Sequence, residues 1–285
     1  MDRQPADPLV STAWLGERLD APDVRVVDAT WLMPGADRDA RADHEVAHIP
    51  GAVFFDIDEI ADTDSPLPHM LPSAAKFASR VRALGLGDGS RIVVYDQTGL
   101  SSAARAWWMF RVFGHTDVTV LDGGLPKWIA EGRPVEDRPA QPRERHFTAR
   151  IDRDLVRDRA QVARALEGGR EQLVDARPAS RFRGEAPEPR PGLRGGHMPG
   201  ARSVPMPSLF ASDGVMLPPE ALARVFAEAG VDASRPVVTS CGSGITACVL
   251  ALALARTGRW RTAVYDGSWA EWGADATLPV VTGPA

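Results

Sequence analysis

The sequence predicts an α/β protein of two tandem domains, each a mainly parallel sheet flanked by helices on both faces. Three observations lead to this prediction. The chain has 285 residues, which suits two domains of ordinary size. Short apolar runs alternate with helical segments, as in parallel sheets that are covered on both faces. Landmarks in the first half of the chain also recur in the second half, in the same order.

The recurring landmarks define an internal duplication, because they keep a nearly constant offset. They are Val27-Asp28-Ala29 with Val174-Asp175-Ala176, His48-Ile49-Pro50-Gly51-Ala52 with His197-Met198-Pro199-Gly200-Ala201, and Asp122-Gly123-Gly124 and Trp128 with Asp266-Gly267-Ser268 and Trp272. Since His48 and His197 occur in both repeats, we expect both to be structural.

The apolar runs place the elements of each repeat. In the first repeat we expect strands at 24–29, 52–55, 91–95 and 118–121, and helices at 72–84 and 101–113. In the second we expect strands at 172–175, 201–204, 236–240 and 262–265, and helices at 219–228 and 245–256. The segment 133–150 is rich in proline and charge without periodicity, which is typical of a connection. The predicted domains are therefore 1–136 and 151–285, joined by a linker at 137–150.

Charge and cysteine content narrow the class of protein. The formal net charge is −5, and no Lys- or Arg-rich face is apparent, so nucleic acid and anionic membranes are poor partners. The charge does not exclude a small anionic substrate. The two cysteines, Cys241 and Cys248, are few enough for a reducing compartment. The first nine residues do not resemble a signal peptide, and no apolar run is long enough to span a membrane. We therefore expect a cytoplasmic enzyme without a membrane segment.

Equivalent positions of the two repeats carry different chemistry. The strand at 91–95 runs into Asp96-Gln97-Thr98-Gly99, and the strand at 236–240 runs into Cys241-Gly242-Ser243-Gly244. Asp96 thus occupies the position of Cys241. One repeat has a nucleophile there and the other a carboxylate, so we expect the first repeat to be catalytically empty.

The surroundings of Cys241 are typical of an active site. Ligand sites in open parallel sheets lie at the carboxyl ends of strands. Gly242 and Gly244 carry no side chain, so backbone N–H groups can turn toward one point. A helix beginning near Ile245 adds partial positive charge, which favours a thiolate or a persulfide anion. The alternative is a buried structural cysteine, and Cys248, inside an apolar helix, fits that alternative better.

Other chemistries lack their motifs. A cysteine phosphatase needs a longer loop ending in an arginine, yet Ala247 stands six residues after Cys241 and the next arginine is Arg256. Gly85-Leu86-Gly87 lacks the third glycine of a dinucleotide fingerprint and is interpreted as a turn. The sequence contains no metal-ligand cluster or nucleotide loop, so we expect neither a metal nor a cofactor.

Several segments together form a family pattern. They are Cys241-Gly242-Ser243-Gly244-Ile245-Thr246-Ala247, both His-x-Pro-Gly-Ala elements, both Asp-Gly-x elements with their tryptophans, Phe54-Phe55-Asp56-Ile57-Asp58, His69-Met70-Leu71-Pro72, Ala106-Trp107-Trp108-Met109-Phe110-Arg111 and Arg181-Phe182-Arg183-Gly184. These segments resemble the rhodanese superfamily and, within it, the tandem-domain 3-mercaptopyruvate sulfurtransferases. The similarity covers nearly the whole chain.

The resemblance implies two rhodanese-like domains and a reaction. Cys241 would take the sulfur of 3-mercaptopyruvate as a persulfide, release pyruvate, and pass the sulfur to a thiol, a thioredoxin-like protein or cyanide. Arg181 and Arg190 would hold the carboxylate and keto oxygen of this thio-keto acid, although on sequence alone their loop could be a solvated connector. The loop residues implied in substrate binding are Gly242, Gly244, Ile245 and Thr246.

The resemblance also implies a proton relay of Ser243, His69 and Asp58, the last two from the first repeat. Without it, His69 would be an ordinary loop histidine. Arg183 is interpreted as structural.

The loop after the cysteine favours one sulfur donor. Thiosulfate-preferring relatives carry basic side chains directly after the cysteine, whereas Gly242 and Ser243 offer hydrogen bonds without charge. A neutral loop suits a monoanionic thio-keto acid better than a compact dianion. A thiosulfate:cyanide sulfurtransferase stays the alternative. A non-enzymatic rhodanese-like module is less favoured, because Arg181 and Arg190 are both present.

Overall fold

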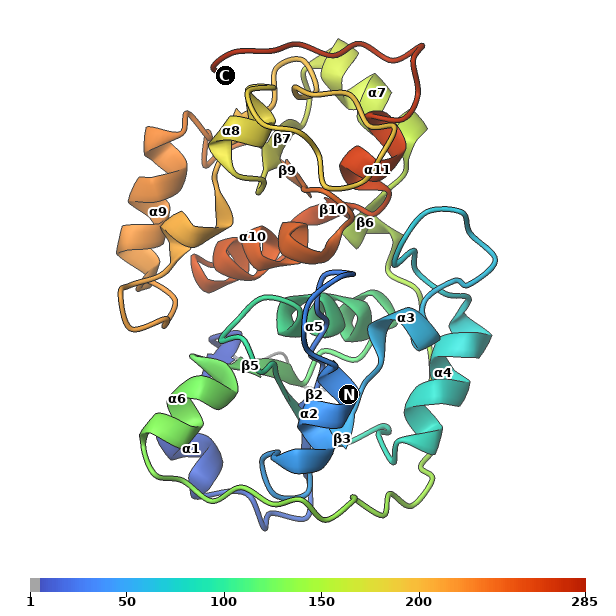
Figure 1. Cartoon of the computed structure of the whole chain (residues 1–285), viewed down its shortest axis with the longest axis vertical. Coiled ribbons are helices and arrows are strands. Elements are labelled where there is room, and N and C mark those ends of the chain that lie inside the picture. The colour runs from blue at the N-terminus through green and yellow to red at the C-terminus, as the bar shows by residue number, and fades with distance from the viewer. Residues whose placement is uncertain (1–5) are drawn as a thin grey trace. The chain divides into compact units, whose positions relative to one another are not determined.

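The structure, a computed structural model, describes residues 6–285 and falls into two compact units (Figure 1). Unit 1 comprises the chain up to Thr63, Leu71–Asp152 and Ser212–Met216; unit 2 comprises Asp64–Met70, Arg153–Ala211 and Leu217–Ala285. The segment 137–150, expected to be a linker, hydrogen-bonds within unit 1, where Arg145 N–H donates to the Arg82 carbonyl and Asp88 N–H to the His146 carbonyl. The domain boundaries at 136 and 151 stay a prediction.

Unit 1 is a five-stranded parallel sheet with helices on both faces. The strand order is β1 (Leu9–Val10), β5 (Val118–Leu121), β4 (Arg91–Tyr95), β2 (Val24–Asp28) and β3 (Val53–Phe54). The helices are α1 (Thr12–Gly16), α2 (Ala40–Val46), α3 (Ile57–Ile60), α4 (Ala74–Ala83), α5 (Ala103–Val112) and α6 (Gly124–Ala130). Leu15 and Trp128 close the core on the α1 and α6 side, and an aromatic cluster that includes Phe77 and Phe110 of α4 and α5 fills another part of the core.

Unit 2 repeats this topology. Its strand order is β6 (Val156–Arg157), β10 (Ala263–Tyr265), β9 (Val237–Ser240), β7 (Gln172–Asp175) and β8 (Arg202–Ser203), all parallel. The helices are α7 (Arg159–Gly168), α8 (Ala179–Phe182), α9 (Pro219–Glu228), α10 (Ile245–Arg256) and α11 (Ser268–Trp272), with 3₁₀ turns at Arg153–Leu155 and Met206–Leu209. The shared strand order confirms the predicted α/β fold of two parallel-sheet repeats.

The sequence pattern found eight of the ten strands and four of the helices of residues 6–285, and it missed the strands β1 and β6 and the helices α1, α2, α3, α6, α7, α8 and α11, of which α7 has ten residues. All eight predicted strands and four predicted helices are present, and those at 91–95, 118–121, 172–175, 219–228 and 245–256 have the predicted bounds. The edge strands β1 and β6 have two residues each, which is too short for any periodicity to appear.

The two His-x-Pro-Gly-Ala elements hold equivalent places. The backbone of His48 forms an antiparallel bridge with Glu136, and that of His197 forms one with Val281. Each Nδ1 hydrogen-bonds a backbone carbonyl, that of His44 at 2.6 Å and that of Phe182 at 2.8 Å. These contacts fit the structural role expected of both histidines, because each ties its turn to the body of its unit.

Helix α10 is apolar on all sides and buried along almost its whole length. Its interior holds Cys248, whose thiol donates to the Gly244 carbonyl at 3.2 Å. Within residues 6–285, no helix combines the length and the apolar character needed to cross a membrane.

Candidate active site

Cys241 lies where a central strand of unit 2 gives way to a helix. Strand β9 ends at Ser240, Cys241 follows, and α10 begins at Ile245. The main chain of the cysteine is held on both sides: its N–H donates to Ser268 Oγ at 3.2 Å, and its carbonyl accepts from Trp269 N–H at 3.0 Å. The residue is 2% exposed. These two hydrogen bonds therefore fix the backbone that carries the thiol.

A main-chain amide points at the sulfur. Gly244 N–H donates to Cys241 Sγ at 3.2 Å. Gly244 has φ 84°, a left-handed conformation that other residues rarely adopt, so the glycine allows the turn that aims this amide. It is also the residue directly before the first turn of α10, whose N-terminus carries partial positive charge. Both features favour negative charge on the sulfur.

The equivalent turn of unit 1 also directs backbone amides at the side chain that follows the central strand, although from other positions. The buried carboxylate of Asp96 accepts backbone N–H groups from Thr98 at 2.9 Å, Ser101 at 2.7 Å and Ala103 at 2.9 Å. In both repeats, therefore, backbone amides point at the side chain directly after the central strand.

Arg181 reaches the loop from α8. Its Nη2 lies 3.2 Å from the point that a Cβ would occupy on Gly242, the residue after the cysteine. A larger residue at Gly242 would crowd the guanidinium, so the glycine opens the space in which the arginine lies. Its side chain is 19% exposed, which leaves part of it accessible to a substrate.

A chain of ion pairs holds Arg181. Its Nε and Nη2 donate to Glu188, whose side chain is 1% exposed. The other Glu188 oxygen accepts from Arg177 Nη1 at 2.8 Å, and Arg177 in turn donates to both oxygens of Asp175 at the end of β7. The four charges sum to zero, and the buried carboxylate of Glu188 orients the arginine next to the cysteine.

His69 and Arg190 meet in unit 2. Arg190 Nη2 lies 3.4 Å from His69 Nε2, and the segment Asp64–Met70 that carries the histidine packs with unit 2 although it belongs to the first repeat by sequence. His69 is 7% exposed and has φ 61°, which is uncommon for a residue other than glycine. Such strain persists where the surrounding structure enforces it, often at functional sites.

The other predicted residues occupy definite places. Ser243 is buried between Gly242 and Gly244, Ile245 and Thr246 form the first turn of α10, and Asp58 in α3 accepts a hydrogen bond from Trp31 Nε1 at 2.8 Å. The structure thus brings Arg181 to the Cys241 loop and Arg190 to His69. The relay of Ser243, His69 and Asp58 stays a prediction.

Sequence reasoning missed two residues, Ser268 and Glu188. Ser268 has φ 50°, accepts the Cys241 N–H and donates to the Tyr265 carbonyl at 2.8 Å. The repeat alignment holds a signal for it, because its counterpart, Gly124, has almost the same φ of 55°. A serine in a position that suits glycine indicates that the hydroxyl has a use. Glu188 gave no signal, since a glutamate in a Pro- and Arg-rich loop usually lies in solvent.

No metal site accompanies these residues. Within residues 6–285, no group of three or more His, Cys, Asp or Glu side chains is placed to hold a metal ion. The expectation of a metal-free and cofactor-free enzyme stays a prediction.

Comparison with known proteins decides the family. The model of the rhodanese-like domain matches residues 11–131 and again 158–275, one match for each repeat. The chain belongs to the rhodanese family. The predicted resemblance is thereby confirmed, and so is the duplication that the recurring landmarks indicated.

Rhodanese relatives with two different names are similar to this chain. The 3-mercaptopyruvate sulfurtransferase of Homo sapiens is 43% identical, covering 93% of this chain and 91% of its own. The Escherichia coli enzyme of that name is also 43% identical, with coverage of 95% and 96%. The thiosulfate sulfurtransferase of Cricetulus griseus is 45% identical, with coverage of 93% and 91%. Overall identity therefore does not separate the two sulfur donors.

A solved rhodanese structure agrees with the fold. The crystal structure of SseA from Escherichia coli, described as a 3-mercaptopyruvate sulfotransferase, superimposes with a TM-score of 0.85 at 39% identity. The match covers 92% of this chain and 99% of that one. The two-repeat rhodanese architecture is thus present along nearly the full chain.

Proposed function

We propose that this enzyme is a sulfurtransferase that takes the sulfur of 3-mercaptopyruvate onto Cys241 as a persulfide and passes it to a thiol. The observation that carries the proposal is the Cys241 loop, where Gly244 N–H donates to Sγ at 3.2 Å. Membership of the rhodanese family supports sulfur transfer as the reaction. The human and Escherichia coli relatives, which are named for 3-mercaptopyruvate, support the donor.

The first half-reaction loads the cysteine. In the proposal, Arg181 and Arg190 bind the carboxylate and keto oxygen of 3-mercaptopyruvate, since guanidinium groups bind such oxygens in pairs. The Cys241 thiolate attacks the substrate sulfur, so that an S–S bond forms and the C–S bond breaks. The electron pair of the C–S bond goes to the pyruvate enolate, which takes up a proton to give pyruvate.

The second half-reaction removes the outer sulfur from the Cys241 persulfide. An acceptor thiolate attacks the outer sulfur of the persulfide, forms a new S–S bond and returns Cys241 as a thiolate. With cyanide as acceptor the product is thiocyanate. With either acceptor, Cys241 is released as a thiolate that faces the Gly244 amide. This amide and the N-terminus of α10 both favour the negative charge on the sulfur.

Proton transfer is assigned to Ser243, His69 and Asp58. Ser243 stands two residues after the nucleophile, and the buried, strained His69 lies against Arg190, an arginine proposed to bind substrate. A histidine so placed suits protonation of the enolate. Asp58 would orient the imidazole.

The charge of the Cys241 loop favours 3-mercaptopyruvate as the sulfur donor. Gly242 and Ser243 are neutral, and the charge of Arg181 is balanced by Glu188. A compact dianion such as thiosulfate would meet no basic side chain in the loop itself, whereas the carboxylate and keto oxygen of a thio-keto acid can extend to Arg181 and Arg190. The acceptor is proposed to be a small thiol or a thioredoxin-like protein, and the location cytoplasmic; one similar relative from Arabidopsis thaliana is named as mitochondrial.

The test is a comparison of donors on the purified enzyme. Pyruvate release from 3-mercaptopyruvate and thiocyanate formation from thiosulfate with cyanide give kcat/KM for each donor. We expect the value for 3-mercaptopyruvate to be higher by at least about tenfold, since a good charge-assisted contact contributes 1.5–3 kcal/mol. A higher kcat/KM for thiosulfate would assign the enzyme to the alternative donor.

A further inference from the structure

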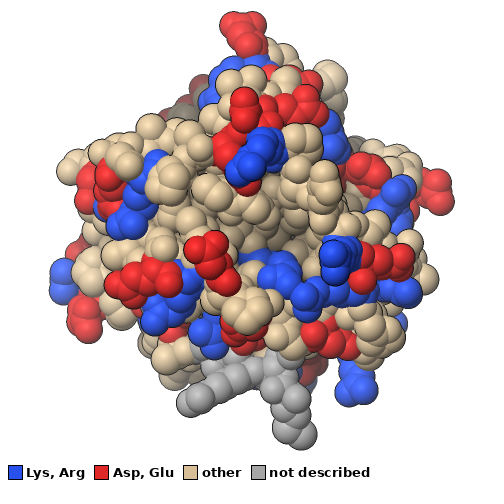
Figure 2. All heavy atoms as spheres, turned by 90° about the horizontal axis from the view of Figure 1, so that it is seen from below, with Lys and Arg blue, Asp and Glu red and all other residues tan. Residues whose placement is uncertain are grey.

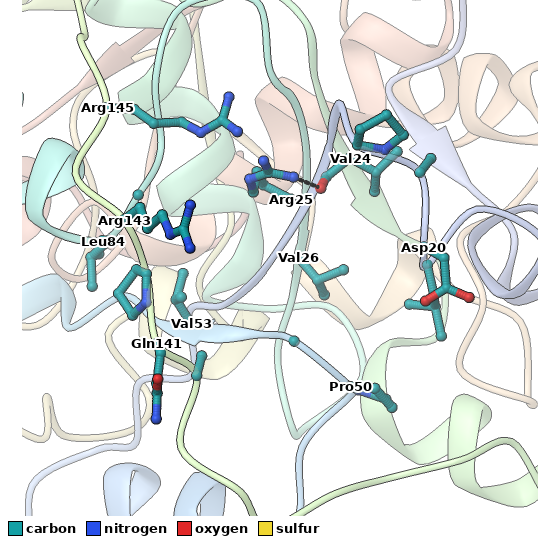
Figure 3. A pocket seen from close by; sticks show the side chains of 17 residues that line it. Asp20, Val24, Arg25, Val26, Pro50, Val53, Leu84, Gln141, Arg143 and Arg145 are labelled. Atoms are coloured by element: carbon teal, nitrogen blue, oxygen red, sulfur yellow. Dashed lines mark hydrogen bonds between the residues drawn. The ribbon is translucent and has the colours of Figure 1, made fainter.

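A pocket in unit 1 is lined by none of the residues assigned above. It has a volume of about 480 Å³, within the range of small-molecule sites. One wall is the turn that carries Asp20, the floor is the start of β2 with Val24, Arg25 and Val26, and the opposite wall is the chain segment 140–145 (Figure 3). All of its lining residues belong to unit 1.

Three arginines from two separate segments line this pocket. Arg25 comes from β2, and Arg143 and Arg145 come from the segment 140–145. Figure 3 shows their side chains on the same side of the pocket, with Asp20 on the opposite side. Arg25 donates to the neighbouring Val24 carbonyl at 2.5 Å. For Arg143 and Arg145, the structure of residues 6–285 shows no side-chain partner.

The acidic residue between the two arginines is engaged elsewhere. Glu144 pairs with Arg82 on α4 at 3.1 Å. Glu144 therefore does not neutralise its two neighbours. The like charges affect each other, since the pKa of Arg25 lies below its usual value because of burial and of the nearby Arg145 guanidinium, with Asp23 acting in the opposite direction.

The segment that carries Arg143 and Arg145 is held in place. Arg145 N–H donates to the Arg82 carbonyl, and Asp88 N–H donates to the His146 carbonyl at 2.8 Å. Gly87 lies directly against this segment, because a Cβ there would be 2.4 Å from the His146 carbonyl oxygen. The backbone next to the pocket is thus fixed before any ligand arrives, which lowers the entropic cost of binding.

A second pocket, in unit 2, provides a contrast. Arg153, Arg157, Arg164 and Arg170 line it together with Asp154 and Glu171. Arg157 is paired with Glu171 at 2.7 Å, and Asp154 accepts from Arg261. On the face drawn in Figure 2, basic and acidic side chains lie next to each other around a largely uncharged central area. Arg157 is thus paired with a carboxylate inside its own pocket, whereas Arg143 and Arg145 of the unit 1 pocket form no ion pair among residues 6–285.

We propose that the unit 1 pocket binds a small organic phosphate, with the phosphate on Arg25, Arg143 and Arg145 and an apolar or aromatic body against Leu19, Val26, Val53 and Leu84. A phosphate dianion matches several guanidinium groups better than a single carboxylate does, and guanidinium binds phosphate oxygens in pairs. The apolar lining gives room for a ring the size of a nucleobase. This site is separate from the sulfur-transfer residues and does not depend on the proposed donor.

The test is calorimetric titration of the whole protein with AMP, with inorganic phosphate and adenosine as partial probes. We expect AMP to bind at one site per chain in the millimolar range or tighter, and more tightly than either partial probe. Arg143→Ala and Arg145→Ala should each weaken AMP binding by about tenfold, the loss expected for one charge-assisted contact. Arg164→Ala, a matched change in the unit 2 pocket, should leave it unchanged.

Three further outcomes decide the proposal. Cys241→Ser should bind AMP as the wild type does, which would place the ligand away from the sulfur-transfer site. Competition between AMP and 3-mercaptopyruvate would overturn the proposal, because it would assign binding to the Cys241 loop. Absence of AMP binding at millimolar concentration, or equal binding by the Arg143→Ala, Arg145→Ala double variant with an unchanged melting temperature, would overturn it as well.

Discussion

Replacement of Glu188 by glutamine tests how Arg181, an arginine proposed to bind the substrate, is held. The Glu188 side chain is 1% exposed and accepts from both Arg177 and Arg181. Glutamine keeps the size and one acceptor oxygen but removes the charge. Arg177 keeps its hydrogen bonds to both oxygens of Asp175, so the loss of the Glu188 charge affects mainly Arg181.

The magnitude follows from these contacts. Removal of one partner of a buried pair costs about 3–5 kcal/mol, but Arg181 is partly exposed and glutamine still accepts a hydrogen bond, so about 1–2 kcal/mol of stability should be lost. An Arg181 that is less well oriented should bind the carboxylate of 3-mercaptopyruvate about tenfold more weakly, or about 1.4 kcal/mol. The effect should appear in KM, with kcat changed much less. Thiosulfate should suffer less, because the change leaves one uncompensated positive charge near the loop.

The assay is steady-state pyruvate release by Glu188→Gln, with Glu185→Gln as the matched control. Glu185 lies in the same loop and pairs with Arg183 at 2.8 Å, in a largely exposed position. The control should match the wild type in KM and melting temperature. If Glu188→Gln lowers the melting temperature but leaves the KM for 3-mercaptopyruvate unchanged, the glutamate is merely structural and the reasoning is wrong.

Three further changes test the site and the fold. His69→Asn, which tolerates the left-handed backbone, should lower kcat by about a hundredfold because proton transfer is lost, and full activity would dismiss the relay. Ser268→Gly should lower kcat about fivefold by removing the hydroxyl that holds the Cys241 N–H, a loss of about 1 kcal/mol, without lowering the melting temperature; unchanged turnover would contradict this. Burial lowers the pKa of His197 in the folded protein. As the pH falls below about 6.5, the unfolded protein therefore protonates this histidine before the folded protein does, and the folded protein loses stability. His197→Gln should therefore show a smaller loss of melting temperature between neutral and acidic pH than the wild type or the exposed control His146→Gln, and equal slopes would refute it.

The fold could be predicted, and Cys241 proposed as the nucleophile, because both inferences depend on local sequence pattern. The apolar strands β4 and β9 and the glycines after Cys241 appear as contiguous residues, and the duplication let Asp96 be compared directly with the cysteine. In the structure, backbone amides contact the Asp96 carboxylate and the Cys241 sulfur, although they come from different positions of the two turns.

The residues that the pattern missed act through contacts distant in sequence. Ser268 meets Cys241 only because the start of α11 packs against the end of β9. The role of Glu188 depends on its burial between Arg177 and Arg181, and sequence alone does not show whether a loop carboxylate is buried. The packing of Asp64–Met70 with unit 2 likewise depends on tertiary structure rather than on sequence position.

The most direct measurement is the intact mass of the protein after brief exposure to 3-mercaptopyruvate without an acceptor. The wild type and Cys248→Ser, which changes the thiol inside α10, should each gain one sulfur atom that a thiol acceptor then removes. Cys241→Ser should gain none. A sulfur adduct of equal yield on Cys241→Ser, or its absence from Cys248→Ser alone, would contradict the assignment of the persulfide to Cys241.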